Sequence, residues 1–455
     1  MNTHARPLSA VLALLLSASA SLAAADPLPA STAPTAPPRL SSLDAYLASI
    51  SGQAGGLTAD EVASRAAATS FDVQARHAEL EAAGAAVDQA LVGFFPRLNV
   101  IGRYQRLSPL DADVLGYLVG PQDQKNPQIG PLQPGTPLAV VPLSFPVLLN
   151  QTLIQASLTI PLSDYVLRIS QNYAAASRSE KAAGLNEEAQ KLKVALDGRV
   201  AYYTWTRARL QSFVAGRALA QARQHLVDVQ HAFDAGAVSK ADVLRVEAQV
   251  ASAELLGQRA GGLVNVAEVS VRTAMHEPAP RAFTLGEDLR AAAAPSAPSA
   301  DAETLYSEAI QRRLEIRALE QTAFSLREQA KVARASYGPR LDAIGDVTVA
   351  NPNQRVIPPT DRFIATWSVG VQASWTLNDI ATGAAQARGA EARRAQIEAQ
   401  KSALADALRL ELALSVQAVR DADFAAGTTA RGLAAAEESY RARRELFLNG
   451  RATSV

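Results

Sequence analysis

Cysteine is absent from this chain of 455 residues, and so is any net charge, because Lys+Arg and Asp+Glu both number 44. The lack of cysteine excludes disulfides, thiolate metal sites, a cysteine nucleophile and a lipid-modified N-terminal cysteine. The lack of net charge excludes a basic field for nucleic acid. Beyond the first residues no apolar run is long enough for a membrane helix, so any part that enters a membrane must do so as β-strands.

Patterns that carry catalytic chemistry are also missing. The five histidines include no HExxH motif and no pair at helical i, i+4 spacing. No glycine-rich phosphate loop with a lysine follows a predicted strand, so the chain is not expected to hydrolyse ATP. We therefore predict that the protein is not an enzyme and holds no cofactor and no metal ion.

The N-terminus has the pattern of a secretory signal. Arg6 supplies positive charge, Leu8 to Leu22 is a short apolar stretch, and three alanines before Asp26 offer a cleavage site. An uncleaved membrane anchor fits less well, because serines interrupt the stretch and it is shorter than about 20 apolar residues. We predict a signal peptide over residues 1–25 and a flexible Pro/Ala/Ser-rich segment over 26–57.

The remaining sequence is duplicated. Phe95-Pro96-Arg97-Leu98 returns as Gly338-Pro339-Arg340-Leu341, an offset of 339 − 96 = 243 positions. Leu162-Ser163-Asp164 returns as Leu377-Asn378-Asp379, an offset of 379 − 164 = 215 positions. A duplicated unit usually packs against its twin, because neither copy can bury its apolar face alone. We predict a first repeat over 58–275, a linker over 276–300 and a second repeat over 301–455.

Each repeat is expected to run helix, strand, strand, very long helix. Alanine-rich composition and three-four spacing of apolar residues predict the helices, and alternation of apolar and polar residues predicts the strands. The second long helix also places Leu433 and Tyr440 one heptad apart, as in a coiled coil. The predicted helices are 58–92, 165–235, 241–275, 301–335 and 382–448; the predicted hairpins are 98–163, with a long Pro/Gly-rich loop from Ser108 to Pro146, and 341–377. The second repeat ends before the returning helix that the first contains. Either the sequence is truncated at its C-terminus or the natural protein lacks this helix, and of the two we expect truncation.

The four strands have one apolar and one polar face. In a soluble sandwich the apolar faces would meet inside, whereas in a membrane barrel they would face lipid. Strands of about 8 to 11 residues between such long helices favour the barrel. Four strands cannot close a membrane barrel, so the chain must self-associate; two copies would give eight strands and three would give twelve.

At this point the sequence resembles the TolC-type outer-membrane efflux channel family over nearly all of its mature length. The resemblance rests on the paired helix–Pro–strand–strand–helix units and on the motif Phe233-x-x-Gly236-x-x-Ser239-x-x-Asp242, partly repeated as Phe447-x-x-Gly450-Arg451-x-Thr453. It implies a mainly α fold with four β-strands. Long helical hairpins form a periplasmic α-barrel, and a homotrimer shares a twelve-stranded transmembrane β-barrel in the outer membrane. Where many members carry Asp-Gly-Gly after the second and fourth strands, this chain has Asp164-Tyr165-Val166 and Asp379-Ile380-Ala381.

The resemblance also implies two sets of site residues. One set forms the periplasmic tip, where an adaptor would dock: Gly236, Ser239, Asp242, Gly450, Arg451 and Thr453. The other set consists of aromatics at the lipid interfaces: Tyr104, Trp367 and Trp375. Simpler explanations stay open, because a reversing helix favours glycine, a first helical turn favours an acidic residue, and aromatics also pack in ordinary apolar contacts.

The function implied is a passive exit duct of a tripartite efflux or type I secretion system. Its partners would be a periplasmic adaptor (membrane fusion) protein, an inner-membrane transporter and outer-membrane lipid. Its location would be the outer membrane with a periplasmic extension. The alternative from another class is a soluble periplasmic coiled-coil adaptor or scaffold, which shares the signal peptide and the long hairpins. The cargo and the cognate pump are not encoded in any recognisable motif.

Overall fold

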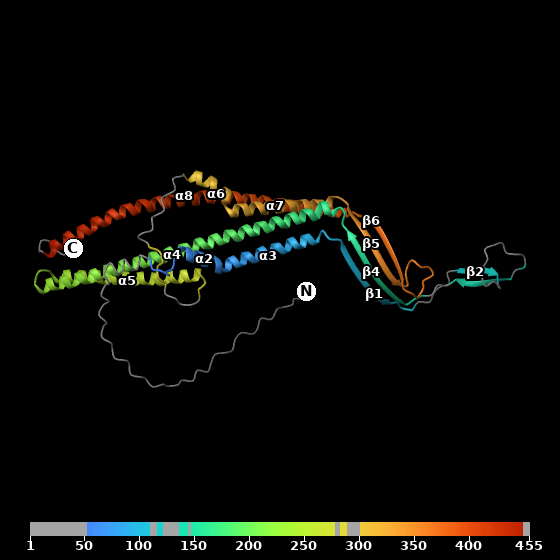
Figure 1. Ribbon diagram of the computed structural model, residues 1–455, viewed down its shortest axis with the longest axis horizontal. Coiled ribbons are helices and arrows are strands. Elements are labelled where there is room, and N and C mark those ends of the chain that lie inside the picture. Colours follow the sequence, from blue (N-terminus) through green and yellow to red (C-terminus); the bar gives the residue numbers. More distant parts are fainter. Residues whose placement is uncertain are drawn as a thin grey trace, which may run out of the picture.

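The computed structural model describes residues 52–109, 116–121, 135, 137–143, 147–277, 283–288 and 301–448. The predicted signal peptide, the rest of the N-terminal segment up to residue 51, and Gly450, Arg451 and Thr453 lie outside these residues. The molecule is elongated, with a β-sheet near one end and a reversing helical turn at the other (Figure 1). None of the described helices is both long and apolar enough to cross a membrane.

The helices of the first repeat follow the prediction except at one point. Thr58 caps the first helix by accepting a hydrogen bond from the Glu61 amide, but the predicted continuous helix over 58–92 is wrong. It breaks at Ser70, whose backbone is extended and whose hydroxyl caps the next helix by accepting from the Val73 amide. The elements are α2 (Ala59–Thr69), α3 (Phe71–Val92), a π-helical turn (Tyr165–Ile169), α4 (Ser170–Asp234) and α5 (Lys240–Ala274).

The second repeat has the same break. The predicted helix over 301–335 is interrupted at Arg313, which lies 313 − 70 = 243 positions after Ser70 and has the same extended backbone. Asp301 caps the first piece by accepting from the Thr304 amide, as Thr58 does in the first repeat. The elements are α6 (Ala302–Arg312), α7 (Leu314–Arg334), a 3-10 turn (Ala335–Tyr337) and α8 (Asn378–Leu448). The interruption is therefore a duplicated feature.

The four predicted strands form one antiparallel sheet, in the order β1-β4-β5-β6. Each repeat supplies one hairpin, and the two hairpins meet where β4 pairs with β5. The observed hairpins span 97–160 and 340–374, within three residues of the predicted 98–163 and 341–377, so Trp375 follows the last strand instead of lying in it. The strands are β1 (Arg97–Arg106), β4 (Asn150–Ile160), β5 (Arg340–Asn351) and β6 (Ile364–Ser374).

A second, two-stranded sheet lies within the segment 108–146, which we predicted as a loop. Its strands β2 (Gly116–Pro121) and β3 (Leu138–Leu143) pair with each other and with no other described strand. This hairpin lies beyond the end of the larger sheet that is far from the helices (Figure 1). The Pro/Gly-rich composition concealed these short strands.

A backbone clasp joins the start of the first repeat to the linker. Leu57 and Leu285 form a parallel bridge, and their neighbours approach so closely that a Cβ added at Gly56 would lie 2.4 Å from the Leu285 carbonyl oxygen. The clasp covers the largest buried cluster, which includes Tyr202 and Trp205 of α4. The segment before α2 and the linker are thereby held against the middle of α4 and the C-terminal end of α5.

Candidate functional site

The turn between α4 and α5 reverses the chain with a complete helix C-cap. Gly236 has φ +76°, a left-handed conformation that glycine adopts without steric cost. Its amide donates to the Phe233 carbonyl at 2.8 Å, and the Ala237 amide donates to the Ala232 carbonyl at 2.8 Å. This pair of bonds is the Schellman motif, a helix C-cap that favours glycine at this position. The turn alone is therefore a sufficient reason for Gly236.

The next helix begins with a reciprocal cap. The Ser239 side chain accepts from the Asp242 amide, and the Asp242 carboxylate accepts from the Ser239 amide at 3.1 Å. The Ser239 hydroxyl donates to the same carboxylate at 2.6 Å, and Arg245 forms an ion pair with it at 2.6 Å. Hydrogen bonds from Ser239, aided by the charge of Arg245, hold the pKa of Asp242 below its ordinary value. Asp242 is therefore an ionised carboxylate near the turn, with a cation beside it.

A small apolar core supports this turn. Val229 of α4 packs with Val243 and Val246 of α5, and all three are buried. On the outside, the Lys240 ammonium lies 5.8 Å from the centre of the Phe233 ring, a cation–π contact. The tip of the α4–α5 hairpin is thus a capped turn above a small apolar core, at the end of the molecule farthest from the sheet (Figure 1).

The four-stranded sheet presents a continuous apolar face. The strand register aligns Val100 with Ala156, Ala156 with Val347, and Val347 with Trp367, so the apolar positions of all four strands share one side. These side chains are exposed in the single chain: Val100 64%, Val347 52% and Trp367 68%. A patch of this extent on a monomer marks a surface that meets lipid or another protein.

The predicted aromatics lie at the two ends of this face. Tyr104 and Trp367 belong to the ends of β1 and β6 far from the helices, and the Tyr104 hydroxyl donates to the Asn150 side chain at 3.2 Å. Trp375 follows β6 at the end nearest the helices. All three are exposed, at 65%, 68% and 54%. Their separation along the strands fits aromatic residues at two interfaces, which remains a proposal.

The sequence analysis missed a charged cluster where the sheet meets the helices. Asp164 lies between Arg168, at 3.6 Å, and Arg340, at 3.4 Å, and Arg340 also pairs with Asp342 at 3.0 Å. Asp164, Arg168 and Arg340 line a cavity of about 510 Å³ together with Arg97. The residues are far apart in sequence, but the duplication already contained a signal, because Arg97 and Arg340 occupy equivalent positions.

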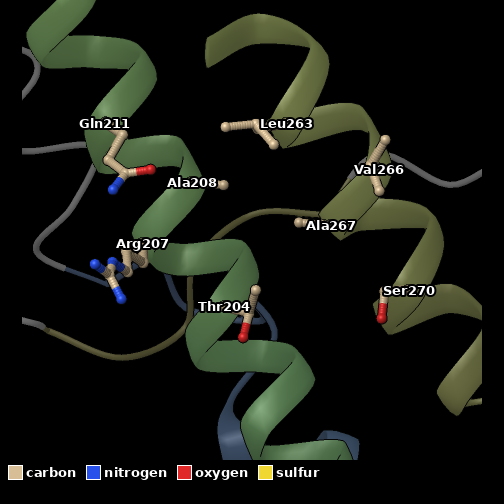
Figure 2. Close-up of a pocket in the computed structure, with 8 residues that line it drawn as sticks. All are labelled: Thr204, Arg207, Ala208, Gln211, Leu263, Val266, Ala267 and Ser270. Carbon is tan, nitrogen blue, oxygen red and sulfur yellow. The ribbon is translucent and has the colours of Figure 1, made fainter. Parts of the chain in front are cut away.

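A shallow hollow of about 380 Å³ lies between α4 and α5. Figure 2 shows its lining side chains on facing stretches of the two helices, with Leu263 directed toward α4. Apolar groups make up most of the lining, and Arg207 is its charged member. Across the described residues no group of three or more His, Asp or Glu side chains is placed to hold a metal ion.

Comparisons with known proteins identify this arrangement. Residues 62–275 match the sequence model of the outer membrane efflux protein family. The chain resembles the outer membrane efflux proteins. A search of curated protein sequences gave no significant match.

Three solved structures have a similar fold. CusC is 13% identical, with 87% of this chain and 83% of that chain covered and a TM-score of 0.67. VceC from Vibrio cholerae is 15% identical, with 87% of each chain covered and a TM-score of 0.65. MtrE of Neisseria gonorrhoeae, described as an outer membrane channel, is 17% identical, with 86% of this chain and 80% of that chain covered and a TM-score of 0.65.

These matches confirm the resemblance to outer-membrane efflux channels that was inferred from the sequence. The fold of these channels, long helices with a small β-domain, accounts for the predicted long helices and for the four-stranded sheet. The family match covers the first repeat, including the tip residues Gly236, Ser239 and Asp242. Their role in docking remains a proposal.

Proposed function

We propose that the chain is one subunit of a passive outer-membrane exit duct. The observation that carries this proposal is the sheet: its apolar face is exposed across all four strands, and it stands at one end of helices about 100 Å long. A strand of 11 residues is about 36 Å long and, when tilted by about 45°, spans roughly 25 Å of hydrocarbon. The long helices then extend into the periplasm.

Three copies would complete the duct. Each chain contributes four strands to a sheet with two open edges, and open edges are not tolerated in lipid. The resemblance to efflux channels favours a homotrimer with a barrel of twelve strands over a dimer with eight. Tyr104, Trp367 and Trp375 would then lie in aromatic girdles at the two lipid interfaces.

The tip of the α4–α5 hairpin is proposed as the docking end. A periplasmic adaptor of an inner-membrane pump would contact Gly236, Ser239 and Asp242, where the chain reverses without a bulky side chain at Gly236. The pump would supply the energy, and the duct would serve a tripartite efflux or type I secretion system. The soluble adaptor alternative is less well supported, because the two hairpins join in one sheet with an exposed apolar face.

Single-channel conductance in planar bilayers, with the full mature protein, tests this function. We expect stable ohmic steps that multivalent cations block from the tip side, because three Asp242 carboxylates would line the entrance. Asp242→Asn should weaken the block several-fold while keeping a side-chain acceptor for the Ser239 amide. Arg245→Gln should strengthen the block, because it removes the cation that partly neutralises Asp242.

Asp88→Asn is the matched control, since Asp88 is an exposed carboxylate on α3, outside the tip. It should leave conductance and block unchanged. Steps that respond equally to Asp242→Asn and Asp88→Asn would keep the duct but remove the tip assignment. A protein that gives no steps and is recovered soluble from the periplasm would contradict the channel and support the adaptor.

A further inference from the structure

The two edges of the four-stranded sheet are complementary surfaces of one duplicated unit. β1 pairs only with β4 and β6 pairs only with β5, so the outer sides of β1 and β6 are unpaired among the described strands (Figure 1). β1 has 10 residues and β6 has 11, and neither contains a proline. Long open edges of this kind are templates for pairing with another chain.

The register of the two hairpins is the same under the sequence offsets. In the first hairpin Arg97 lies opposite Thr159, and in the second Arg340 lies opposite Ser374. The two leading residues differ by 340 − 97 = 243 positions and the two trailing residues by 374 − 159 = 215, the offsets of the duplication itself. The β4–β5 contact is therefore the contact between the trailing strand of one hairpin and the leading strand of the next.

Applying the same offsets to β4–β5 gives a register for the open edges. Ala156 of β4 lies opposite Val347 of β5. Their equivalents are Val371 of β6 and Tyr104 of β1, which lie on opposite edges of one chain. In the same way Leu158 opposite Gly345 becomes Ala373 opposite Gly102. These pairs can form only between two copies, because three strand spacings of about 4.8 Å separate β1 from β6 within a chain.

Charges at the junction with the helices support the same pairing. Where β4 meets β5, Asp164 and Arg340 form an ion pair at 3.4 Å. Their equivalents in the other repeat are Asp379 and Arg97. None of the ion pairs among the described residues involves Asp379 or Arg97, and both residues are exposed. Placed at a β6–β1 contact, they would neutralise each other.

The residues around Asp164 and Arg340 differ from those around Asp379 and Arg97, but each of the two groups of side chains has no net charge. Arg168 adds a cation beside Asp164, and Asp342 adds an anion beside Arg340. At the equivalent positions the chain has Gly383 and Asn99, which add neither charge. Two opposite charges are thus lost together, as expected if both positions belong to one junction.

We infer that β6 of one copy pairs with β1 of the next in the register of β4 and β5, and that Asp379 of one copy forms an ion pair with Arg97 of the other. The inference rests on the proposed oligomeric duct and specifies its subunit contact. Val371 then faces Tyr104 of the neighbouring copy, and Ala373 faces Gly102. Hydrogen bonds like those between Ser163 and Leu341, at 3.2 and 3.0 Å, would link Asn378 with Leu98.

Disulfide trapping tests this register, and the natural absence of cysteine makes the background clean. Two double variants place cysteines in register: Tyr104→Cys with Val371→Cys, and Gly102→Cys with Ala373→Cys. Two crossed variants use the same four positions two residues out of register: Gly102→Cys with Val371→Cys, and Tyr104→Cys with Ala373→Cys. Cα atoms in register lie about 4.5–5.5 Å apart, which a disulfide can bridge, whereas diagonal positions lie about 7–8 Å apart.

We expect oxidant to convert at least one in-register variant of the full chain, in outer membranes, to reducible dimers and higher species, at least tenfold more than its crossed counterparts. Equal or greater cross-linking of the crossed variants would overturn the register, and so would absent cross-linking in variants that conduct like the parent. Conductance of the parent is a separate test of the duct, so the two failures are distinguishable.

Charge reversal tests the ion pair. Arg97→Asp and Asp379→Arg should each lower the fraction of protein that stays oligomeric on mild heating in detergent, and the double variant should recover most of that loss. Single variants that match the parent, or a double variant that is worse than both singles, would overturn the Arg97–Asp379 contact.

Discussion

At the residue scale, Tyr202 is the clearest example of a titratable group set by its packing. It is fully buried beneath the clasp, and its ring centre lies 5.9 Å from that of Trp205. Burial, aided by the charge of Glu287, raises the pKa of Tyr202 to about 12 from its ordinary value of 10. The folded chain therefore favours the neutral phenol, because a buried phenolate would lose its hydration.

The sign of the resulting pH dependence follows from this shift. The unfolded tyrosine ionises near pH 10 and the folded one near 12, so its contribution to stability is present below pH 10 and is lost as the pH rises toward 12. The loss is on the order of 2–3 kcal/mol. Denaturant unfolding at several pH values should show it in the parent and not in Tyr202→Phe. Tyr203→Phe, at a half-exposed neighbour, should retain most of it; equal profiles for all three proteins would refute the assignment.

Prediction from sequence is easiest at the residue scale where an interaction is local. The caps at Thr58, Ser239 and Asp301 each join a side chain to an amide three residues later, so the local sequence contains both partners. The pair between Asp164 and Arg340 depends on the pairing of β4 with β5. No local pattern predicts this ion pair, although the duplication draws attention to both residues, because each has an equivalent of the same type in the other repeat.

At the element scale, the periodic spacing of apolar residues predicted the order of helices and strands. The features that were not predicted are those that leave no periodic pattern in the sequence. The breaks at Ser70 and Arg313 involve no proline or glycine, which are the residues that mark an interruption in sequence. The short strands β2 and β3 lie in a segment whose prolines and glycines indicate turns. The helix–strand units around them were read correctly because they extend over many residues.

Close packing between α8 and the end of α7 depends on a single glycine. A Cβ added at Gly383 would lie 1.8 Å from the Ser336 Oγ and 2.6 Å from the Ala333 carbonyl oxygen, and the second of these is backbone. Gly383→Ala should therefore lower the free energy of unfolding by about 1–3 kcal/mol.

Gly389, on the same helix, has no atom within 4 Å of an added Cβ. Gly389→Ala should instead raise stability by about 1 kcal/mol, the difference in helix propensity. Thermal unfolding of the two variants in detergent measures both effects. Shifts of the same sign for both substitutions would show that the separation of α7 and α8 is more adaptable than the contacts indicate.

At the scale of the whole molecule, one face of the four-stranded sheet is apolar and the other is polar. Two adjacent residues of β5 lie on opposite faces and allow the faces to be compared. Val347 is on the apolar face, opposite Trp367, and Thr348 is on the other. If the apolar face meets lipid, Val347→Arg should cost about 2–4 kcal/mol of membrane insertion, whereas Thr348→Arg should be tolerated. Recovery of each variant in outer membranes measures this. Equal losses for both would argue that the two faces are not lipid and water.

The substitution of Gly383 and Asn99 for Arg168 and Asp342 has a mechanical consequence. Around a closed ring, junctions inside a chain would alternate with junctions between chains, and only the internal ones carry the extra arginine and aspartate. Around the barrel, the more strongly held β4–β5 contacts would then alternate with the more weakly held β6–β1 contacts. Under mechanical load, heat or high salt the assembly should dissociate at the β6–β1 contacts. It should release intact subunits, each with its own four-stranded sheet still folded.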